Sequence, residues 1–206
     1  MIARQVRFPS FAREVELGKE GYLAIAGVDE VGRGALAGPV VAAAVVLQPG
    51  TGWLSQLRDS KKLSARKREG LSAAIHQGAI AVGIGSSSPM QIDRIGIAAA
   101  TDAAMLAAIE KVSQDFLLVD GARFPFPQYA GEPIVRGDNL SRSIAAASIV
   151  AKVYRDQLMK DYAGIYSGYG FERHKGYATP EHLDALCRLG VSPIHRRSFK
   201  PVRRAI

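Results

Sequence analysis

Two apolar runs near the N-terminus, joined by a short glycine-rich link, dominate the pattern of hydrophobic and polar positions. Residues 22–30 and 39–47 are rich in Ala, Val and Ile, and glycine or proline bounds each run. This is the pattern of buried β-strands. Because the link is too short for a crossover helix, the two strands are expected to be antiparallel neighbours in one sheet.

Three shorter apolar segments are expected to add strands to this sheet, at residues 79–85, 116–119 and 133–135. Between and after them, apolar residues recur at helical spacing. Helices are predicted over 65–77, with Ser64 as N-cap, over 89–111 and 141–162, and from Thr179 to Gly190. A short helix is expected within residues 1–20. Strands and helices that mix in this way are typical of an α/β domain.

The two long predicted helices carry apolar stripes that are expected to face the core. In the first, the stripe comprises Ile92, Ile95, Ala99, Ala103, Leu106 and Ile109. In the second, Arg155 and Lys160 are expected to face water. Lys152 lies among small residues, where it either extends its charge to the surface or contacts a phosphate, and we favour the phosphate.

Charge and cysteine content narrow the class of protein. The 206 residues carry 27 Lys and Arg against 19 Asp and Glu, a net charge of +8. This charge suits a polyanionic partner, but by itself it fits a soluble protein that happens to be basic equally well. The single cysteine, Cys187, excludes an internal disulfide and is expected to pack in the core. No segment resembles a secretory signal or a membrane span, so a cytoplasmic protein without membrane contact is expected.

Four acids follow predicted strands. Asp29 and Glu30 end the first strand, Asp120 follows the segment 116–119, and Asp138 follows the segment 133–135. If these strands are neighbours, the carboxylates converge and need a cation to stay ionised together. Oxygen ligands without a Cys or His cluster favour Mg²⁺ or Mn²⁺, and two such ions ~4 Å apart would suit phosphoryl displacement. Acids at strand ends also serve as caps or surface groups.

The triplet Gly32-Arg33-Gly34 follows the first pair of acids. Glycines allow close approach of a ligand to the backbone, and a guanidinium suits phosphate. The glycine spacing does not match the dinucleotide-binding fingerprint, and the chain has no Walker-type loop. His174 and His195 lie in basic segments, where phosphate binding or exposure is expected instead of metal ligation.

Several motifs in order resemble the ribonuclease HII family across residues 21 to 202. They are GVDEVGRG (27–34), LAGPVVAAAV (36–45), DSKKLS (59–64), VDG (119–121), GD (137–138), IAAASIVAKVYRD (144–156), HKGY (174–177) and HRRSF (195–199). The resemblance implies a ribonuclease H-like mixed five-stranded sheet flanked by helices, with a small helical C-terminal segment. It implies one domain over 1–206, with a core at about 21–165 and a substrate-contacting segment at 166–206.

The activity that the resemblance implies is metal-dependent cleavage of RNA in RNA–DNA hybrids, and cleavage 5′ of single ribonucleotides within duplex DNA. The family's four acids match Asp29, Glu30, Asp120 and Asp138, which would bind two Mg²⁺ or Mn²⁺ ions. Gly32, Arg33 and Gly34 match the motif that recognises the ribose 2′-hydroxyl and adjacent phosphates. Tyr177 matches a tyrosine that stacks at the ribonucleotide–deoxynucleotide junction. Phosphate contacts are expected from Lys61, Lys62, Lys152 and Lys175.

Two alternatives stay open at the level of sequence. One is a nuclease or recombinase of the same fold that acts on DNA junctions and ignores the 2′-hydroxyl. The other is a basic module that binds hybrids or RNA without catalysis, which the four acids disfavour. A monomer is expected. Ala35 and Arg136 differ from residues common in the family, and neither is one of the acids.

Overall fold

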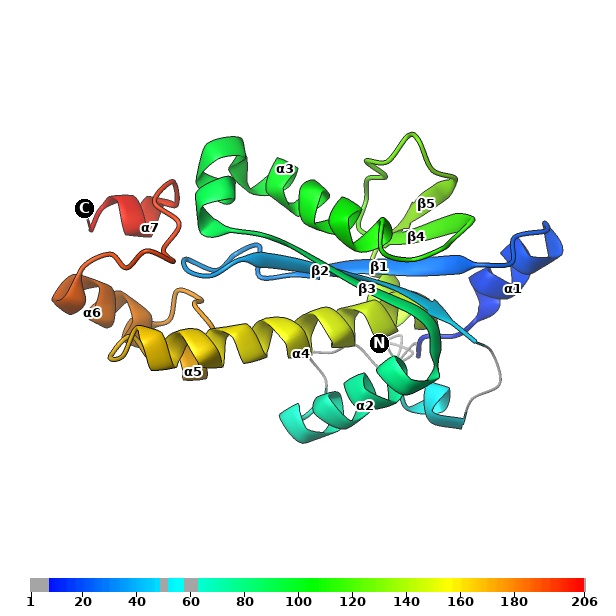
Figure 1. Cartoon of the computed structure of the whole chain (residues 1–206), viewed down its shortest axis with the longest axis horizontal. Coiled ribbons are helices and arrows are strands. Elements are labelled where there is room, and N and C mark those ends of the chain that lie inside the picture. Colours follow the sequence, from blue (N-terminus) through cyan, green and yellow to red (C-terminus); the bar gives the residue numbers. More distant parts are fainter. Residues whose placement is uncertain (1–7, 49–51, 58–62, 206) are drawn as a thin grey trace, which may run out of the picture.

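The computed structural model describes residues 8–48, 52–57 and 63–205. Its centre is a five-stranded mixed sheet in the order β3-β2-β1-β4-β5 (Figure 1). The strands are β1 (Ile25–Val31), β2 (Val40–Leu47), β3 (Ala79–Ser87), β4 (Phe116–Asp120) and β5 (Gly131–Ile134). β1 runs antiparallel to β2, as expected, and parallel to β4. The predicted α/β fold with a mixed five-stranded sheet is therefore confirmed.

Helices cover both faces of the sheet. In Figure 1, α3 lies over one face, and α4 and α2 lie over the other. The helices are α1 (Ala12–Lys19), α2 (Ala65–Gly78), α3 (Pro89–Ile109), α4 (Arg142–Ile165), α5 (Phe171–His174), α6 (Pro180–Leu189) and α7 (Lys200–Arg203). Ser64 and Thr179 cap α2 and α6 as predicted, each accepting a backbone N–H bond on its side-chain oxygen. The short helices α5 and α7 were not expected.

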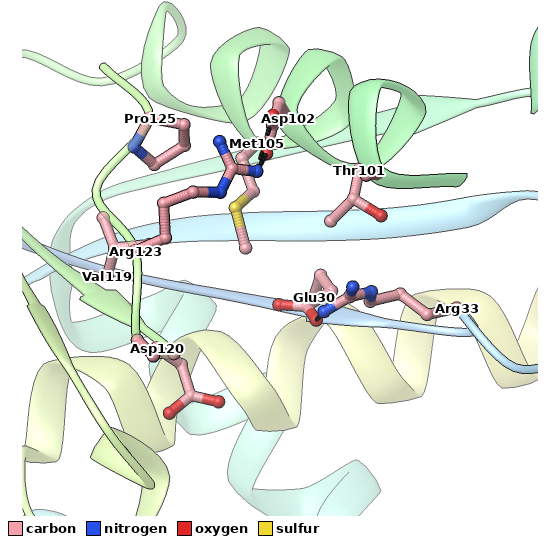
Figure 2. A pocket seen from close by; sticks show the side chains of 12 residues that line it. Glu30, Arg33, Thr101, Asp102, Met105, Val119, Asp120, Arg123 and Pro125 are labelled. Carbon is pink, nitrogen blue, oxygen red and sulfur yellow. Dashed lines mark hydrogen bonds and ion pairs between the residues drawn. The ribbon is translucent and has the colours of Figure 1, made fainter. Parts of the chain in front are cut away.

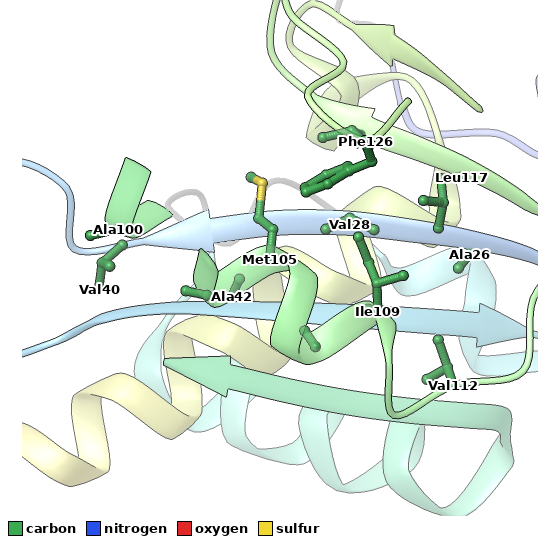
Figure 3. Close-up of a cluster of buried hydrophobic side chains, with 14 of the residues drawn as sticks. Ala26, Val28, Val40, Ala42, Ala100, Met105, Ile109, Val112, Leu117 and Phe126 are labelled. Atoms are coloured by element: carbon green, nitrogen blue, oxygen red, sulfur yellow. The ribbon is translucent and has the colours of Figure 1, made fainter. Parts of the chain in front are cut away.

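The side chains of β1 alternate between two hydrophobic layers. Ala26 and Val28 belong to the cluster beneath α3, together with Met105 and Leu117 (Figure 3). Gly27 faces α4, and a Cβ there would lie 2.0 Å from the carbonyl carbon of Ser143, so helix and strand are in backbone contact. By the same alternation, the next two residues of the strand, Asp29 and Glu30, point to opposite faces of the sheet.

The apolar stripe of α3 differs from the prediction. Ile92 and Ile109 are buried, but Ile95 is 39% exposed and Ala99 is exposed. The residues that fill the core instead are Ala100, Thr101, Ala104, Met105 and Ala108. The cause is Gly96, whose φ of 79° interrupts the helix and shifts the face that the following turns present to the sheet.

The C-terminal helices pack at one end of the sheet. Ala37, next to β2, shares a buried cluster with Met159 of α4, Phe171 of α5 and Ala185 of α6. Cys187 is exposed on α6, so its expected core position was wrong. Its neighbours Ala185 and Leu186 occupy the buried side of this amphipathic helix. Among the described residues, no helix combines the length and apolar character needed to cross a membrane.

Candidate active site

The four predicted acids lie at one edge of the sheet. Val28 of β1 pairs with Val119 of β4, the last pair in their parallel register, so the next residues, Asp29 and Asp120, lie where this pairing ends. The turn after β5 returns to the same place, because the N–H of Gly137 donates to Asp120 Oδ1 at 2.7 Å. Asp138 follows directly and is 8% exposed. The chain thus brings the carboxylates to a common edge, as the strand order requires.

Asp29 is the most enclosed of these acids. Its Oδ1 accepts the N–H of Glu30 at 2.7 Å, and Ser148 of α4 also bonds its carboxylate. Burial raises the pKa of Asp29 well above its ordinary value, and the charges of Glu30 and Asp120 raise it further. The two hydrogen bonds oppose this shift without cancelling it. Asp29 therefore lies in a field of negative charge that its protein neighbours leave largely uncompensated.

Glu30 points to the other face of β1 and pairs with Arg33. The distance from Arg33 Nη1 to Glu30 Oε1 is 3.3 Å. Burial raises the pKa of Glu30, whereas the charge of Arg33 and its hydrogen bond lower it. This ion pair links a carboxylate of the acidic group to the glycine-arginine-glycine triplet. The acids and the triplet therefore meet at the C-terminal end of β1.

A cavity of about 220 Å³ opens beside these groups (Figure 2). Glu30, Arg33 and Asp120 line it from the sheet side. Arg123 lines it from the loop after β4 and donates from Nη2 to both carboxylate oxygens of Asp102, at 2.8 Å each. The sequence did not indicate this ion pair, because Asp102 has no distinguishing neighbours along α3. The cavity has charged residues in its lining and adjoins the acids, as a substrate site requires.

The donor set of the acidic edge fits a hard cation. Across residues 8–48, 52–57 and 63–205, no three His, Cys, Asp or Glu side chains form a ready-made metal cage. Mg²⁺ commonly takes only one or two protein carboxylates and completes its shell with water and substrate phosphate oxygens. Burial, and after it the charges of Glu30 and Asp120, raise the pKa of Asp29, and a bound cation would favour its ionised form again. All candidate ligands are oxygen atoms, which excludes the donor set of a structural zinc site.

The glycine triplet forms a tight turn at the end of β1. Gly32 has a φ of 92°, and a Cβ there would lie 2.1 Å from Arg155 Nε. Gly34 has no heavy atom within 4 Å of such a Cβ, so its backbone is open to a ligand. The Arg33 side chain is 55% exposed. The turn thus has a packed inner side and an accessible outer side.

The other predicted substrate contacts are spread around this turn. Tyr177 is half-buried, and the guanidinium carbon of Arg155 lies 5.5 Å from the centre of its ring. Lys152 pairs with Asp156 at 2.6 Å, and Lys175 donates to the carbonyl of Glu172. Lys61 and Lys62 lie outside the described residues.

Two predictions about charged residues were wrong. Arg155 is fully buried, not solvent-facing, because backbone carbonyls distant in sequence surround its guanidinium. The sequence held a signal for this, since Arg155 lies one turn beyond Ala151 on the apolar face of α4. His174 and His195 are also buried, at 9% and 2% exposure. Instead of facing water, His174 stacks on the ring of His182, and His195 hydrogen-bonds to His182.

His195 and His182 form an ordered chain of hydrogen bonds, and the ring of His174 stacks on that of His182. The Nε2 atoms of His182 and His195 are 3.0 Å apart, and His195 Nδ1 accepts the N–H of Ser192 at 3.0 Å. His195 must therefore donate from Nε2, and His182 donates from Nδ1 to the carbonyl of Tyr177 at 2.9 Å. This arrangement holds the backbone of Tyr177 and requires both imidazoles to be neutral.

Comparison with known proteins gives a consistent result. Residues 26–202 match the family model described as Ribonuclease HII. A ribonuclease HII of Rhodospirillum rubrum is 54% identical over 188 residues, which cover 88% of this chain and 86% of the relative. A ribonuclease HII of Desulfitobacterium hafniense is 52% identical over 195 residues, which cover 94% of this chain and 75% of the relative.

Solved structures agree in fold. The RNase HII in the PCNA:RNase HII complex from Archaeoglobus fulgidus has a TM-score of 0.75 and 26% identity over 86% of this chain and 96% of its own. The Bst-RNase HIII structure in complex with Mn²⁺ has a TM-score of 0.69 and 18% identity, and the match covers 89% of this chain and 69% of that structure. At this identity the comparison shows only a common fold. With a family match over residues 26–202 and relatives at about half identity, this chain belongs to the ribonuclease HII family and is a ribonuclease H hydrolase.

Proposed function

We propose that this ribonuclease H cleaves the RNA strand of RNA–DNA hybrids and nicks duplex DNA on the 5′ side of a single embedded ribonucleotide, leaving a 3′-hydroxyl and a 5′-phosphate. The observation that carries the proposal is the Glu30–Arg33 ion pair in the lining of the cavity. It places the acids and the glycine-arginine-glycine turn at one strand end. A phosphate at the acids would therefore have its ribose beside the turn.

Asp29, Glu30, Asp120 and Asp138 would hold Mg²⁺ or Mn²⁺ together with substrate oxygens. Bound divalent ions would activate a water molecule and neutralise charge on the scissile phosphate. Gly32, Arg33 and Gly34 would recognise the 2′-hydroxyl, the one group that distinguishes ribose from deoxyribose. The open backbone at Gly34 supports this role, because no side chain blocks the ligand.

The segment 166–206 would complete the substrate surface of a single domain spanning 1–206, whose core is 21–165. Tyr177 would stack at the junction between ribonucleotide and deoxynucleotide. Lys61, Lys62, Lys152 and Lys175 would contact duplex phosphates, which makes binding sensitive to salt. We propose that the enzyme acts as a monomer on hybrids and on ribonucleotide-containing DNA.

The test uses a labelled DNA duplex that carries one ribonucleotide, with Mg²⁺ or Mn²⁺. We expect a single cut 5′ of the ribonucleotide, and no cut in an all-DNA duplex or with excess chelator. Asp29→Asn should bind the duplex but not cut it. Lys160→Ala, which changes an exposed lysine remote from the acids, is the matched control and should cut normally.

Two results would contradict the proposal. Cutting of all-DNA junctions with indifference to the 2′-hydroxyl would support a DNA-junction nuclease on the same fold. Binding without products, equal with and without Mg²⁺, would support a non-catalytic nucleic-acid-binding module.

A further inference from the structure

Two fully buried arginines lie behind the glycine-arginine-glycine turn. Arg155 and Arg196 are each 0% exposed, and within the described part of the chain neither has a carboxylate in ion-pair distance. Burial lowers the pKa of both, and to about 9 for Arg196, where the charge of Arg155 contributes. Buried charges without counter-ions are unfavourable unless their donors are satisfied. Among the described residues, Nη2 of Arg196 is buried without a hydrogen-bond partner, whereas no buried nitrogen of the Arg155 side chain lacks one. The hydrogen bonds of Arg155 therefore show what this side chain is retained to do.

Arg155 joins two segments that are distant in sequence. Its Nε donates to the carbonyl of Pro39 at 2.9 Å, and Nη2 donates to that of Ala37 at 3.2 Å. Both carbonyls belong to the segment that leads from the turn into β2. On the other side, Nη1 donates to the carbonyl of Lys175 at 3.0 Å, and the guanidinium faces the ring of Tyr177. This planar side chain, together with the backbone bond from the N–H of Leu36 to the carbonyl of Gly176 at 2.8 Å, sets the separation between the turn and Tyr177.

The packing around this guanidinium leaves little freedom. A Cβ at Gly32 would lie 2.1 Å from Arg155 Nε, and one at Gly176 would lie 2.5 Å from the carbonyl oxygen of Ala37. Glycine at both positions lets the two segments close on the arginine. A lysine could keep the charge, but its single ammonium lacks the planar fork needed to reach carbonyls on both sides.

Arg196 provides a natural comparison. Its Nε donates to the carbonyl of Gly38 at 3.0 Å and its Nη1 to that of Arg33 at 2.8 Å. Its guanidinium faces Phe199, not Tyr177. The side-chain hydrogen bonds of Arg196 therefore hold only the turn and the residues that follow it, although its charge also interacts with Tyr177. Those of Arg155 reach both this segment and Lys175, two residues before Tyr177.

We propose that Arg155 is a positioning residue that sets the distance between the glycine-arginine-glycine turn and Tyr177, and thereby the preference for a ribonucleotide–deoxynucleotide junction over a continuous hybrid. The inference rests on the proposed function, in which the turn recognises any ribose but Tyr177 acts only at a junction. Loss of Arg155 then impairs junction cleavage more strongly than cleavage of a continuous hybrid. Loss of Arg196 impairs cleavage of both substrates alike.

The kinetic test compares Arg155→Lys, Arg196→Lys and the unmodified chain. For each, kcat/KM is measured on a duplex with one ribonucleotide and on a long hybrid, and the ratio of the two values is the readout. We expect Arg155→Lys to lower the ratio about tenfold, since small misplacements near a reacting group have effects of this order or more. Arg196→Lys should lower both values and leave the ratio unchanged. In the Tyr177→Ala background, Arg155→Lys should not lower the ratio further.

A second measurement does not depend on cleavage. Hydrogen exchange of the free enzyme, followed by mass spectrometry, reports the order of residues 32–38 and 174–179. Arg155→Lys should increase exchange in both segments, and Arg196→Lys chiefly in 32–38. If the unmodified enzyme shows no junction cleavage, the proposed function fails, and this exchange pattern still decides whether Arg155 couples the segments. An unchanged ratio, or unchanged exchange at 174–179 in Arg155→Lys, would overturn the inference.

Discussion

The buried histidines of the C-terminal segment make the stability of this fold dependent on pH. His195 is 2% exposed and His182 is 0% exposed, and their hydrogen bonds require neutral rings. Burial lowers the pKa of His195 from 6.5 to about 4, and the neighbouring His182 contributes. Burial also lowers the pKa of His182. These rings therefore bind protons more readily in the unfolded chain than in the folded one, and acid favours unfolding.

The size of the effect follows from His195. The difference between 6.5 and about 4, at ~1.4 kcal/mol per pKa unit, corresponds to about 3 kcal/mol. A depressed histidine pKa means that the unfolded state binds more protons. The full stability is therefore present above pH 6.5 and is lost as the pH falls from 6.5 toward 4. His182 acts in the same direction and steepens the loss.

The assay is urea unfolding between pH 7.5 and 4.5, with chelator present so that metal binding does not contribute. His195→Gln should be less stable at pH 7.5 and should lose less stability on acidification than the unmodified chain. His76→Gln, which removes an exposed histidine of α2, is the matched control and should follow the unmodified chain. The difference between variants isolates His195 from Asp29, whose raised pKa acts in the opposite direction.

Equal pH dependence of His195→Gln and the unmodified chain would refute this reasoning. The reasoning would also be refuted if the unmodified chain were more stable at pH 5 than at pH 7.5 and His195→Gln lacked this gain. Either result would mean that the histidines are protonated within the folded protein.

Three further predictions concern the acidic edge and the turn. Asp29→Asn should abolish cleavage and raise the metal-free melting temperature at pH 7.5, because the ionised carboxylate is buried beside like charges; a lower melting temperature would contradict this. Mg²⁺ at one hundred times its Kd should stabilise the unmodified chain by about 2.7 kcal/mol in urea unfolding and Asp29→Asn by much less; equal stabilisation of both would place the ion elsewhere. Gly32→Ala should cost about 1–3 kcal/mol, since its φ is 92° and the added Cβ meets Arg155, whereas Gly34→Ala, with open space, should be near neutral in the same assay.

Local sequence was sufficient for most of the fold. Four of the strands contain a contiguous apolar run, and Ser64 and Thr179 mark helix starts through a side chain and a nearby backbone N–H. The fifth, β5, is Gly131–Ile134 instead of the predicted 133–135, because Glu132 and Pro133 give it no apolar pattern. The prediction of the α3 stripe was wrong after Gly96, because a single periodicity assumes an unbroken helix. The neighbours of Gly96 did not indicate that its φ would be positive.

The acidic edge was predictable for a different reason. Strand ends that carry acids converge once the strands are adjacent, and the sheet order makes them so. Arg155 and His195 were predicted to be exposed because they are polar residue types, although both are buried. Their partners, such as the carbonyl of Ala37 and the ring of His182, lie in other segments of the chain. No local pattern reports a hydrogen bond across such a separation.

The parallel pairing of β1 with β4 has a consequence for the folding kinetics of this enzyme. Gly27 pairs with Leu118, and the intervening chain forms β2, β3, α2 and α3. Closing so long a loop is slow compared with forming the local β1–β2 hairpin. Asp29 and Asp120 become neighbours only when that closure is complete. During refolding, hydrolytic activity is therefore expected to return with the last long-range contact of the sheet, after most secondary structure has formed.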